Sequence, residues 1–235
     1  MVEKIVAAAG SAVSFFEVGP GPAVLTLPLS LQGLVVAVEA DPRMVAISRL
    51  AVPSAEIIHE DALRLDWRSV LQPMSEPRAI VSNMPYNITG PLLDRVCGVR
   101  DLISIAILMM QKEVGEKILA QPGDSGRGAL SVVIQRLFEV GRVCTAPAGA
   151  FAPPPKVDSV VLRLVPRTSL RSDEDALAKF VRRGFTQPRK KLSNNLGENG
   201  GAVVAAGLNP NIRPHQLSQD EWVRLFDARL GGDKG

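Results

Sequence analysis

The stretch Ala79-Ile80-Val81-Ser82-Asn83-Met84-Pro85-Tyr86 joins an apolar run to an abrupt polar turn. The apolar run Ala79-Ile80-Val81 predicts a buried strand over 79–83, and the asparagine and proline at its end are common turn residues. Tyr86 is the only tyrosine in the chain. An asparagine oxygen and a backbone carbonyl beside the proline can accept the two N–H bonds of an exocyclic amine, while a tyrosine stacks on its ring. The pattern therefore predicts either an ordinary strand-to-loop turn or a clamp for methyl transfer to a nitrogen of adenine, cytosine or glutamine.

Outward from this stretch, strand-like runs alternate with helical segments over the first two-thirds of the chain. Strands are expected at 13–18, 34–39, 55–59, 79–83, 102–109, 140–145 and 157–164, and helices at 22–31, 42–50, 91–96, 113–119 and 130–138. This β–α alternation predicts a doubly wound parallel α/β sheet, with a continuous apolar central strand at 102–109. No long helix separates the last two strands, so they can form an antiparallel edge.

The composition changes after Pro166, where short helical segments follow one another without strands. We therefore expect two domains: a Rossmann-like domain over 1–167 and a small all-helical domain over 168–235. Helices of the second domain are expected at 173–184, 189–196, 202–206 and 220–230.

Charge in the second domain is one-sided. Residues 180–197 contain no acidic residue, but they include the five cations Arg182, Arg183, Arg189, Lys190 and Lys191. Such a run indicates either a solvated helix face or a surface that contacts phosphates. The net charge of the whole chain is only +3, which is weak evidence for an anionic partner.

Composition excludes several classes of protein. No apolar stretch is long enough to cross a membrane, and the N-terminus lacks a charged-then-apolar signal pattern, so we expect a cytoplasmic protein without a membrane partner. His59 and His215 are the only histidines, and with Cys97 and Cys144 they show no metal-ligand spacing. We therefore expect no metal, two free thiols, and a monomer.

Three further strand ends carry residues suited to an adenosine-containing cofactor. Gly19 and Gly21 follow the first strand, where glycines let the backbone approach a ligand. Glu39 ends the second strand, where an acid can accept hydrogen bonds from both ribose hydroxyls. Asp61, followed by Ala62, comes after the third strand and can accept a hydrogen bond from the adenine amine.

Each acid alone is more often a solvated loop carboxylate, but the four strand ends together predict one site, because ligands of open α/β sheets bind outside the carboxyl ends of strands. No Walker motif indicates ATP, and Val24 stands where a dinucleotide fingerprint needs glycine. S-adenosylmethionine fits best, with its reactive end directed at the clamp of Asn83, the Pro85 carbonyl and Tyr86.

The segment Phe151-Ala152-Pro153-Pro154-Pro155-Lys156-Val157-Asp158-Ser159 is stiff and extended because of its prolines. It can hold Phe151 at the mouth of the pocket, opposite Tyr86, so that the two rings sandwich a base. Alternatively, it is a rigid edge loop. Lys156 can meet a phosphate or merely cap the loop.

These residues match a known family. The chain resembles the small-subunit ribosomal RNA adenine N6,N6-dimethyltransferases of the kasugamycin-resistance type. The sequences Asn-x-Pro-Tyr-Asn-Ile and Phe-x-Pro-Pro-Pro-Lys-Val-Asp-Ser carry most of the resemblance. Matching segments run in family order at 17–21, 39, 60–62, 83–89, 111–114, 151–165 and 185–196.

The resemblance implies a Rossmann-like methyltransferase domain and a helical domain that docks ribosomal RNA. It implies that Gly19, Glu39, Asp61 and Asn83 line the S-adenosylmethionine site. It also implies two methylations on each of two adjacent adenosines in the 3′-terminal hairpin of the small-subunit RNA. The implied partner is the immature small subunit, whose assembly such enzymes monitor.

The sequence departs from the family pattern in two places. Members usually carry a Gly-Gln-x-Phe-Leu-like motif that covers the cofactor, ahead of a helix that matches residues 1–6 here. The given sequence does not contain this motif, so we expect weaker cofactor binding. The alternative function is therefore an RNA-binding assembly factor with weak or no catalysis. Pro188 replaces an arginine, which predicts one weaker RNA contact. An enzyme acting on large-subunit RNA, a mitochondrial transcription-factor relative and a glutamine methyltransferase remain competing hypotheses.

Overall fold

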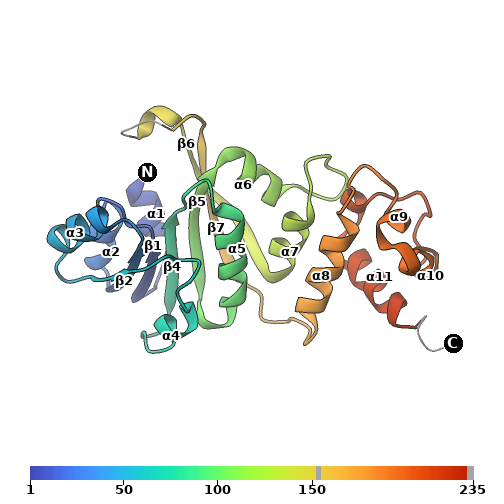
Figure 1. Cartoon of the computed structure of the whole chain (residues 1–235), viewed down its shortest axis with the longest axis horizontal. Helices are drawn as coiled ribbons and strands as arrows, with labels where there is room; N and C mark the ends of the chain where they lie inside the picture. The colour runs from blue at the N-terminus through green and yellow to red at the C-terminus, as the bar shows by residue number, and fades with distance from the viewer. Residues whose placement is uncertain (152–154, 232–235) are drawn as a thin grey trace. The chain divides into compact units, whose positions relative to one another are not determined.

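The computed structural model describes residues 1–151 and 155–231, and the chain forms two compact units (Figure 1). The first unit comprises Met1–Gly115 and Phe138–Pro166, and the second comprises Glu116–Leu137 and Arg167–Gly235. The sequence predicts a single boundary between 167 and 168. It gives no signal that 116–137 groups with the C-terminal helices, because that grouping depends on tertiary contacts.

The first unit is built on a mixed sheet, which among the described residues has seven strands in the order β3-β2-β1-β4-β5-β7-β6. The strands are β1 (Ser14–Val18), β2 (Leu34–Glu39), β3 (Glu56–His59), β4 (Arg78–Asn83), β5 (Ile105–Gln111), β6 (Phe138–Ala146) and β7 (Ser159–Pro166). Pairs among β1–β5 are parallel, whereas β7 is antiparallel to both β5 and β6. The predicted doubly wound sheet with an antiparallel edge is therefore confirmed.

The helices of the first unit follow the predicted order, with differences at their ends. They are α1 (Val2–Ala8), α2 (Thr26–Ser30), α3 (Pro42–Ala51), α4 (Trp67–Leu71), α5 (Thr89–Gly98) and the first turn of α6 (Lys112–Leu119). The predicted helix at 22–31 is shorter because Ala23 has a φ of 64°, which an α-helix does not accept. Helix α4 was not predicted, although its N-cap Asp66, which accepts from the Arg68 amide, was a usable signal.

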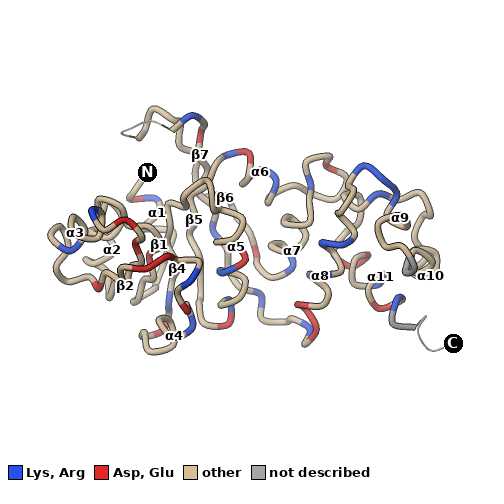
Figure 2. The backbone as a smooth tube through the Cα atoms, viewed as in Figure 1, with Lys and Arg blue, Asp and Glu red and all other residues tan. Residues whose placement is uncertain are grey.

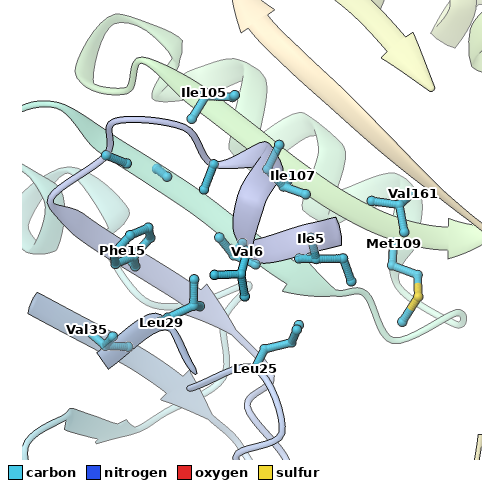
Figure 3. Packing of buried hydrophobic residues seen from close by; sticks show 14 residues of the cluster. Ile5, Val6, Phe15, Leu25, Leu29, Val35, Ile105, Ile107, Met109 and Val161 are labelled. Atoms are coloured by element: carbon cyan, nitrogen blue, oxygen red, sulfur yellow. The ribbon is translucent and has the colours of Figure 1, made fainter. Parts of the chain in front are cut away.

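Both faces of the central strands are covered, which explains why their sequences are apolar throughout. On one face, Phe15 and Val35 of the sheet belong to a buried cluster with residues of α1 and α2 (Figure 3). On the other face, Phe16 packs edge-on against Trp67 of α4, with ring centroids 5.1 Å apart. Arg95 of α5 lies over the same Trp67 ring, so α4 and α5 share this face.

The described residues of the second unit form helices and connecting turns, and none of them forms a strand. Its helices are α7 (Ala129–Leu137), α8 (Glu174–Gly184), α9 (Leu192–Leu196), α10 (Ala202–Ala205) and α11 (Gln219–Gly231), with 3-10 turns at Gly197–Gly201 and Pro214–Gln216. Trp222 stacks on Phe185, and Arg136 of α7 pairs with the buried Glu174 of α8 at 2.6 Å. A Cβ atom at Gly184 would lie 2.5 Å from the Trp222 ring, so this close contact requires glycine. The predicted helical C-terminal part is confirmed.

Among the described helices, none combines the length and apolar character needed to cross a bilayer.

Candidate active site

The strand ends predicted to form the site lie along one edge of the sheet. In the parallel register, Val18 of β1 pairs with Val38 of β2 and with Ser82 of β4. The order of the strands reverses between β1 and β4, because β2 and β3 extend to one side and β5 to the other (Figure 1). Ligands of open α/β sheets bind at such a reversal, outside the carboxyl ends of the strands.

The glycine turn after β1 lies beside the loop after β4. Gly19 has a φ of 72°, and a Cβ atom there would lie 3.9 Å from Cγ of Pro85. The Ser82 hydroxyl donates to the Val18 carbonyl at 2.7 Å, which fixes the two strand ends together. A side chain at position 19 would be strained and would fill the space beside Pro85. The two sequence motifs therefore form one structural unit.

Glu39 connects the ends of β1 and β2. Its Oε2 accepts from the Gly21 amide at 3.1 Å, and its Oε1 accepts from the Asp41 amide at 2.9 Å. The Ser48 hydroxyl of α3 donates to the Gly21 carbonyl at 2.6 Å and supports the same loop. Because each carboxylate oxygen has two acceptor positions, Glu39 can hold this loop and still accept from ligand hydroxyls.

Asp61 and Ala62 follow β3 in a loop that joins the end of β2. The Glu60 amide donates to the Glu39 carbonyl at 3.1 Å. Asp61 caps its own turn, since its Oδ1 accepts from the Leu63 amide at 2.8 Å. The Ala62 carbonyl accepts from the indole N–H of Trp67 at 2.8 Å. The structure thus places Glu39, Asp61 and Ala62 at adjacent strand ends, with part of the Asp61 carboxylate already used.

The loop after β4 presents Asn83 to solvent. The Asn83 side chain is exposed and forms no hydrogen bond within residues 1–151 and 155–231. Met84 is buried, and its amide donates to the Met109 carbonyl at 2.9 Å. The Asn83 amide group is therefore held at a fixed place by its backbone while its polar atoms remain available.

The predicted role of the Pro85 carbonyl is not supported. That oxygen already accepts from the Ile88 amide at 3.1 Å and from the Thr89 hydroxyl at 3.2 Å, which occupies both of its acceptor positions. The Met84 carbonyl, by contrast, accepts no hydrogen bond from the described part of the chain. The sequence could not reveal this difference, because it depends on how the loop turns into α5.

Tyr86 and Phe151 do not meet as predicted. The Tyr86 ring is half-buried, and its hydroxyl lies 2.6 Å from the Ser159 hydroxyl. Phe151 packs against the apolar cluster beneath α1, and no ring contact with Tyr86 occurs among the described residues. Ala152, Pro153 and Pro154, part of the predicted stiff segment, lie outside the described residues. Lys156 is exposed.

The five cations of the second unit form what we call the basic surface: Arg182, Arg183, Arg189, Lys190 and Lys191. All five are exposed, on the end of α8 and on the loop before α9 (Figure 2). Helix α9 begins only at Leu192, so the last three lie on a turn rather than on the predicted helix. Asn195 shapes this turn, because its side chain bonds the Gln187 amide at 2.9 Å and the Gln187 carbonyl at 3.1 Å.

Comparison with known proteins identifies the family. The model of the family described as ribosomal RNA adenine dimethylase matches residues 4–229. The chain belongs to this family. Ribosomal RNA small subunit methyltransferase A of Geobacter sulfurreducens is 42% identical over 241 residues, covering 94% of this chain and 87% of the relative. The protein of the same name from Alcanivorax borkumensis is 40% identical over 218 residues, covering 89% and 77%.

Two solved structures resemble this dimethylase over both units. A dimethyladenosine transferase from Plasmodium falciparum has a TM-score of 0.79 and 24% identity, covering 97% of this chain and 95% of that one. The 23S rRNA methyltransferase ErmE has a TM-score of 0.72 and 27% identity, covering 97% and 96%. The predicted family, fold and enzyme class are therefore confirmed, and a glutamine methyltransferase is excluded.

The sequence did not single out a buried acid beside the strand-end site of this dimethylase, Glu17. It lies on β1 two residues before Gly19 and is 1% exposed. Its Oε2 has no hydrogen-bond partner among the described residues. Burial, with a smaller contribution from the nearby Glu39 charge, raises the pKa of Glu17 from 4.5 to about 7. The Glu that opens the Glu-Val-Gly-Pro-Gly motif was the signal that could have identified it.

We expect Glu17→Gln to stabilise the dimethylase above neutral pH. Because the pKa is raised from 4.5 to about 7, the folded state keeps a proton that the unfolded state loses, and the free energy of unfolding falls as pH rises through this window. Above pH 7, the ionised Glu17 lowers the free energy of unfolding by about 3 kcal/mol. Urea unfolding from pH 4 to 8 measures this effect. At pH 8 the free energy of unfolding of the variant should exceed that of the wild type by about the same amount, and at pH 4 the two should differ little. A difference that stays constant with pH would refute the buried-proton account.

Proposed function

We propose that this chain uses S-adenosylmethionine to dimethylate N6 of two adjacent adenosines in the 3′-terminal hairpin of small-subunit ribosomal RNA, during assembly of that subunit. The observation that carries the proposal is that the ends of β1 and β4 are joined next to Gly19 and Asn83, because the Ser82 hydroxyl donates to the Val18 carbonyl at 2.7 Å. The names of the curated relatives support the small subunit rather than the large one as the source of the RNA.

The residues at the strand ends fit this cofactor. The site offers carboxylates to a ligand rich in donors: Glu39 for ribose hydroxyls and Asp61 beside Ala62 for the adenine amine. Gly19 and Gly21, both at positive φ, let the backbone come close. When bound, S-adenosylmethionine supplies a methyl group on a positively charged sulfur.

The chain's own contribution is to orient the adenine amine. The amine is a poor nucleophile because its lone pair is delocalised into the ring. We propose that Asn83 Oδ1 and the Met84 carbonyl, in place of the Pro85 carbonyl, accept its two N–H bonds and so direct the lone pair out of the ring plane. Tyr86 offers its ring to the flipped-out base, and such stacking contributes about 1–3 kcal/mol. Most of the acceleration then comes from positioning.

The proton released after methyl transfer needs no dedicated base, because Asn83 and Pro85 are exposed to water. After the first transfer the amine retains one N–H bond, so one of its two acceptors loses its partner. The second transfer therefore requires the methylated amine to turn within the same loop.

The basic surface is proposed to dock the ribosomal RNA, together with Lys156. Its cations lie at the end of α8 and on the turn before α9, and all five are solvent-exposed, as phosphate-contacting residues must be. The proposed partner is the immature small subunit, the proposed state is a monomer, and this substrate would place the protein in the cytoplasm.

Cofactor binding provides the test. Glu39→Gln keeps the size of the side chain but removes the charge that would accept two ribose hydroxyls. Calorimetry with S-adenosylmethionine should show affinity about 10- to 100-fold weaker than in the wild type, since hydrogen bonds to charged groups contribute about 1.5–3 kcal/mol.

Glu60→Gln is the matched control, because Glu60 is an exposed acid on the adjacent strand end, and its side chain accepts only from the Asp61 amide, at 2.9 Å, among the described residues. It should bind nearly as the wild type does. Equal affinities of all three proteins for S-adenosylmethionine would mean that Glu39 does not bind the cofactor. A wild type without measurable binding would favour the RNA-binding assembly factor.

A further inference from the structure

The Tyr86 hydroxyl is bonded to a buried serine that no part of the proposed mechanism uses. Ser159 is completely buried at the start of β7, and its hydroxyl lies 2.6 Å from that of Tyr86. The two residues are 73 positions apart in the sequence, on different strands and loops. The bond therefore joins the Asn83–Tyr86 loop to the antiparallel edge of the sheet.

Ser159 is a rigid anchor. Its backbone pairs with Gln111 of β5 on one side and Ala146 of β6 on the other. The preceding residue, Asp158, is also fixed, since its carbonyl accepts from the Lys112 amide at 2.9 Å and its Oδ1 accepts from the Ala148 amide at 3.1 Å. The position of the Ser159 hydroxyl is therefore fixed by its backbone, and the Tyr86 hydroxyl bonds to it there.

Tyr86, in contrast, lies on a loop whose other hydrogen bonds hold its backbone, such as the bond from the Met84 amide to the Met109 carbonyl at 2.9 Å. The Thr89 hydroxyl is within 3.2 Å of the Pro85 carbonyl and 3.4 Å of the Tyr86 carbonyl, and both contacts hold the backbone rather than the ring. Among the described residues, the bond to Ser159 is the only hydrogen bond that the Tyr86 side chain makes. The hydroxyl pair is therefore the polar contact that orients the ring itself.

We propose that Ser159 is a positioning residue for methyl transfer: it holds the Tyr86 ring in the orientation that receives the target base. This role rests on the proposed function. A ring that is already oriented loses less conformational freedom when the base stacks on it. If the ring is released, only a fraction of complexes has a competent pocket, and the rate falls by that fraction.

The kinetic signature follows from where the RNA binds. Docking through the basic surface precedes insertion of the base, so a loosened ring affects the bound complex and not the docking step. We therefore expect Ser159→Ala to lower kcat by about 10-fold, with KM for RNA and for S-adenosylmethionine nearly unchanged. Tyr86→Phe keeps the ring and removes only the hydroxyl, so it should show the same loss.

The test is a double-mutant cycle with these two substitutions. If the hydroxyls act only through each other, the double variant should be no slower than either single variant. Ser14→Ala is the matched control: Ser14 is also completely buried in the same sheet, but its hydroxyl has no partner in the described structure. It should leave kcat unchanged.

A second readout does not depend on activity. Because Tyr86 is the only tyrosine, 13C labelling of the tyrosine ring carbon that bears the hydroxyl gives a single NMR resonance. That resonance should move in Ser159→Ala and stay in place in Ser14→Ala. Additive kcat losses, a wild-type kcat in Ser159→Ala, or an unmoved resonance would overturn the role of Ser159 while leaving methyl transfer intact. A wild type that transfers no methyl group would overturn the proposed function, and this role with it.

Discussion

Asn83→Ala is expected to lower the rate of methyl transfer by about 100- to 1,000-fold, the range for loss of one well-placed polar group or of correct positioning at a reacting centre. In the proposed mechanism the Asn83 oxygen is one of two acceptors that orient the amine, and its side chain has no hydrogen bond within the described structure. Single-turnover transfer to immature small subunits measures the step directly. Thermal unfolding should be nearly unchanged, because the side chain is exposed.

Asn87→Ala is the control for this prediction. Asn87 is the same residue type, is also exposed and lies in the same loop, and its side chain forms no hydrogen bond within the described residues. It should lose far less activity than Asn83→Ala, and RNA binding should be unaffected in both. Comparable rates for the wild type and Asn83→Ala would mean that the loop does not hold the reacting amine.

Neutralising Arg189, Lys190 and Lys191 with glutamine is the second large expected effect. Each cation that binds a phosphate releases counterions, so the slope of log affinity against log salt should fall by about one for each cation that is neutralised, or about three in total. Binding of the hairpin RNA by fluorescence anisotropy at several salt concentrations gives this slope. The kcat at saturating RNA should change little, because these residues lie outside the strand-end site.

The matched control removes the same charge elsewhere in the same unit. Arg167, Arg213 and Arg224 are exposed and lie outside the basic surface. Replacing all three by glutamine should leave most of the salt dependence in place. If both triple variants flatten the slope equally, the RNA is attracted by the general field of the protein and not by a localised surface.

Most of the fold was predictable because its signals are local. The strands and their order of appearance follow from apolar runs that alternate with helical segments, and Gly19, Glu39, Asp61 and Asn83 stand where those runs end. Parallel strands then bring their carboxyl ends to one edge without any further information. For this reason the sequence alone predicts that these four positions lie along one edge of the sheet.

The features of the site that could not be predicted depend on the path of a loop or on contacts between residues far apart in the sequence. The Pro85 carbonyl is occupied because the loop turns directly into α5, and the Ser159 hydroxyl reaches Tyr86 only because β7 lies beside β5. Phe151 packs against the apolar cluster and does not face Tyr86 across a pocket. The raised pKa of Glu17 is a consequence of burial, which a single acidic residue in a glycine-rich motif does not disclose.

The central claim is that the strand-end site transfers methyl groups to adenine N6 of small-subunit RNA. The most direct measurement is nucleoside analysis of immature small subunits incubated with this chain and S-adenosylmethionine that carries a deuterated methyl group. We predict deuterated N6,N6-dimethyladenosine at two adjacent positions of the 3′-terminal hairpin, and a large loss of it with Asn83→Ala. Label on a different nucleoside, or no label although the cofactor binds, would contradict the claim.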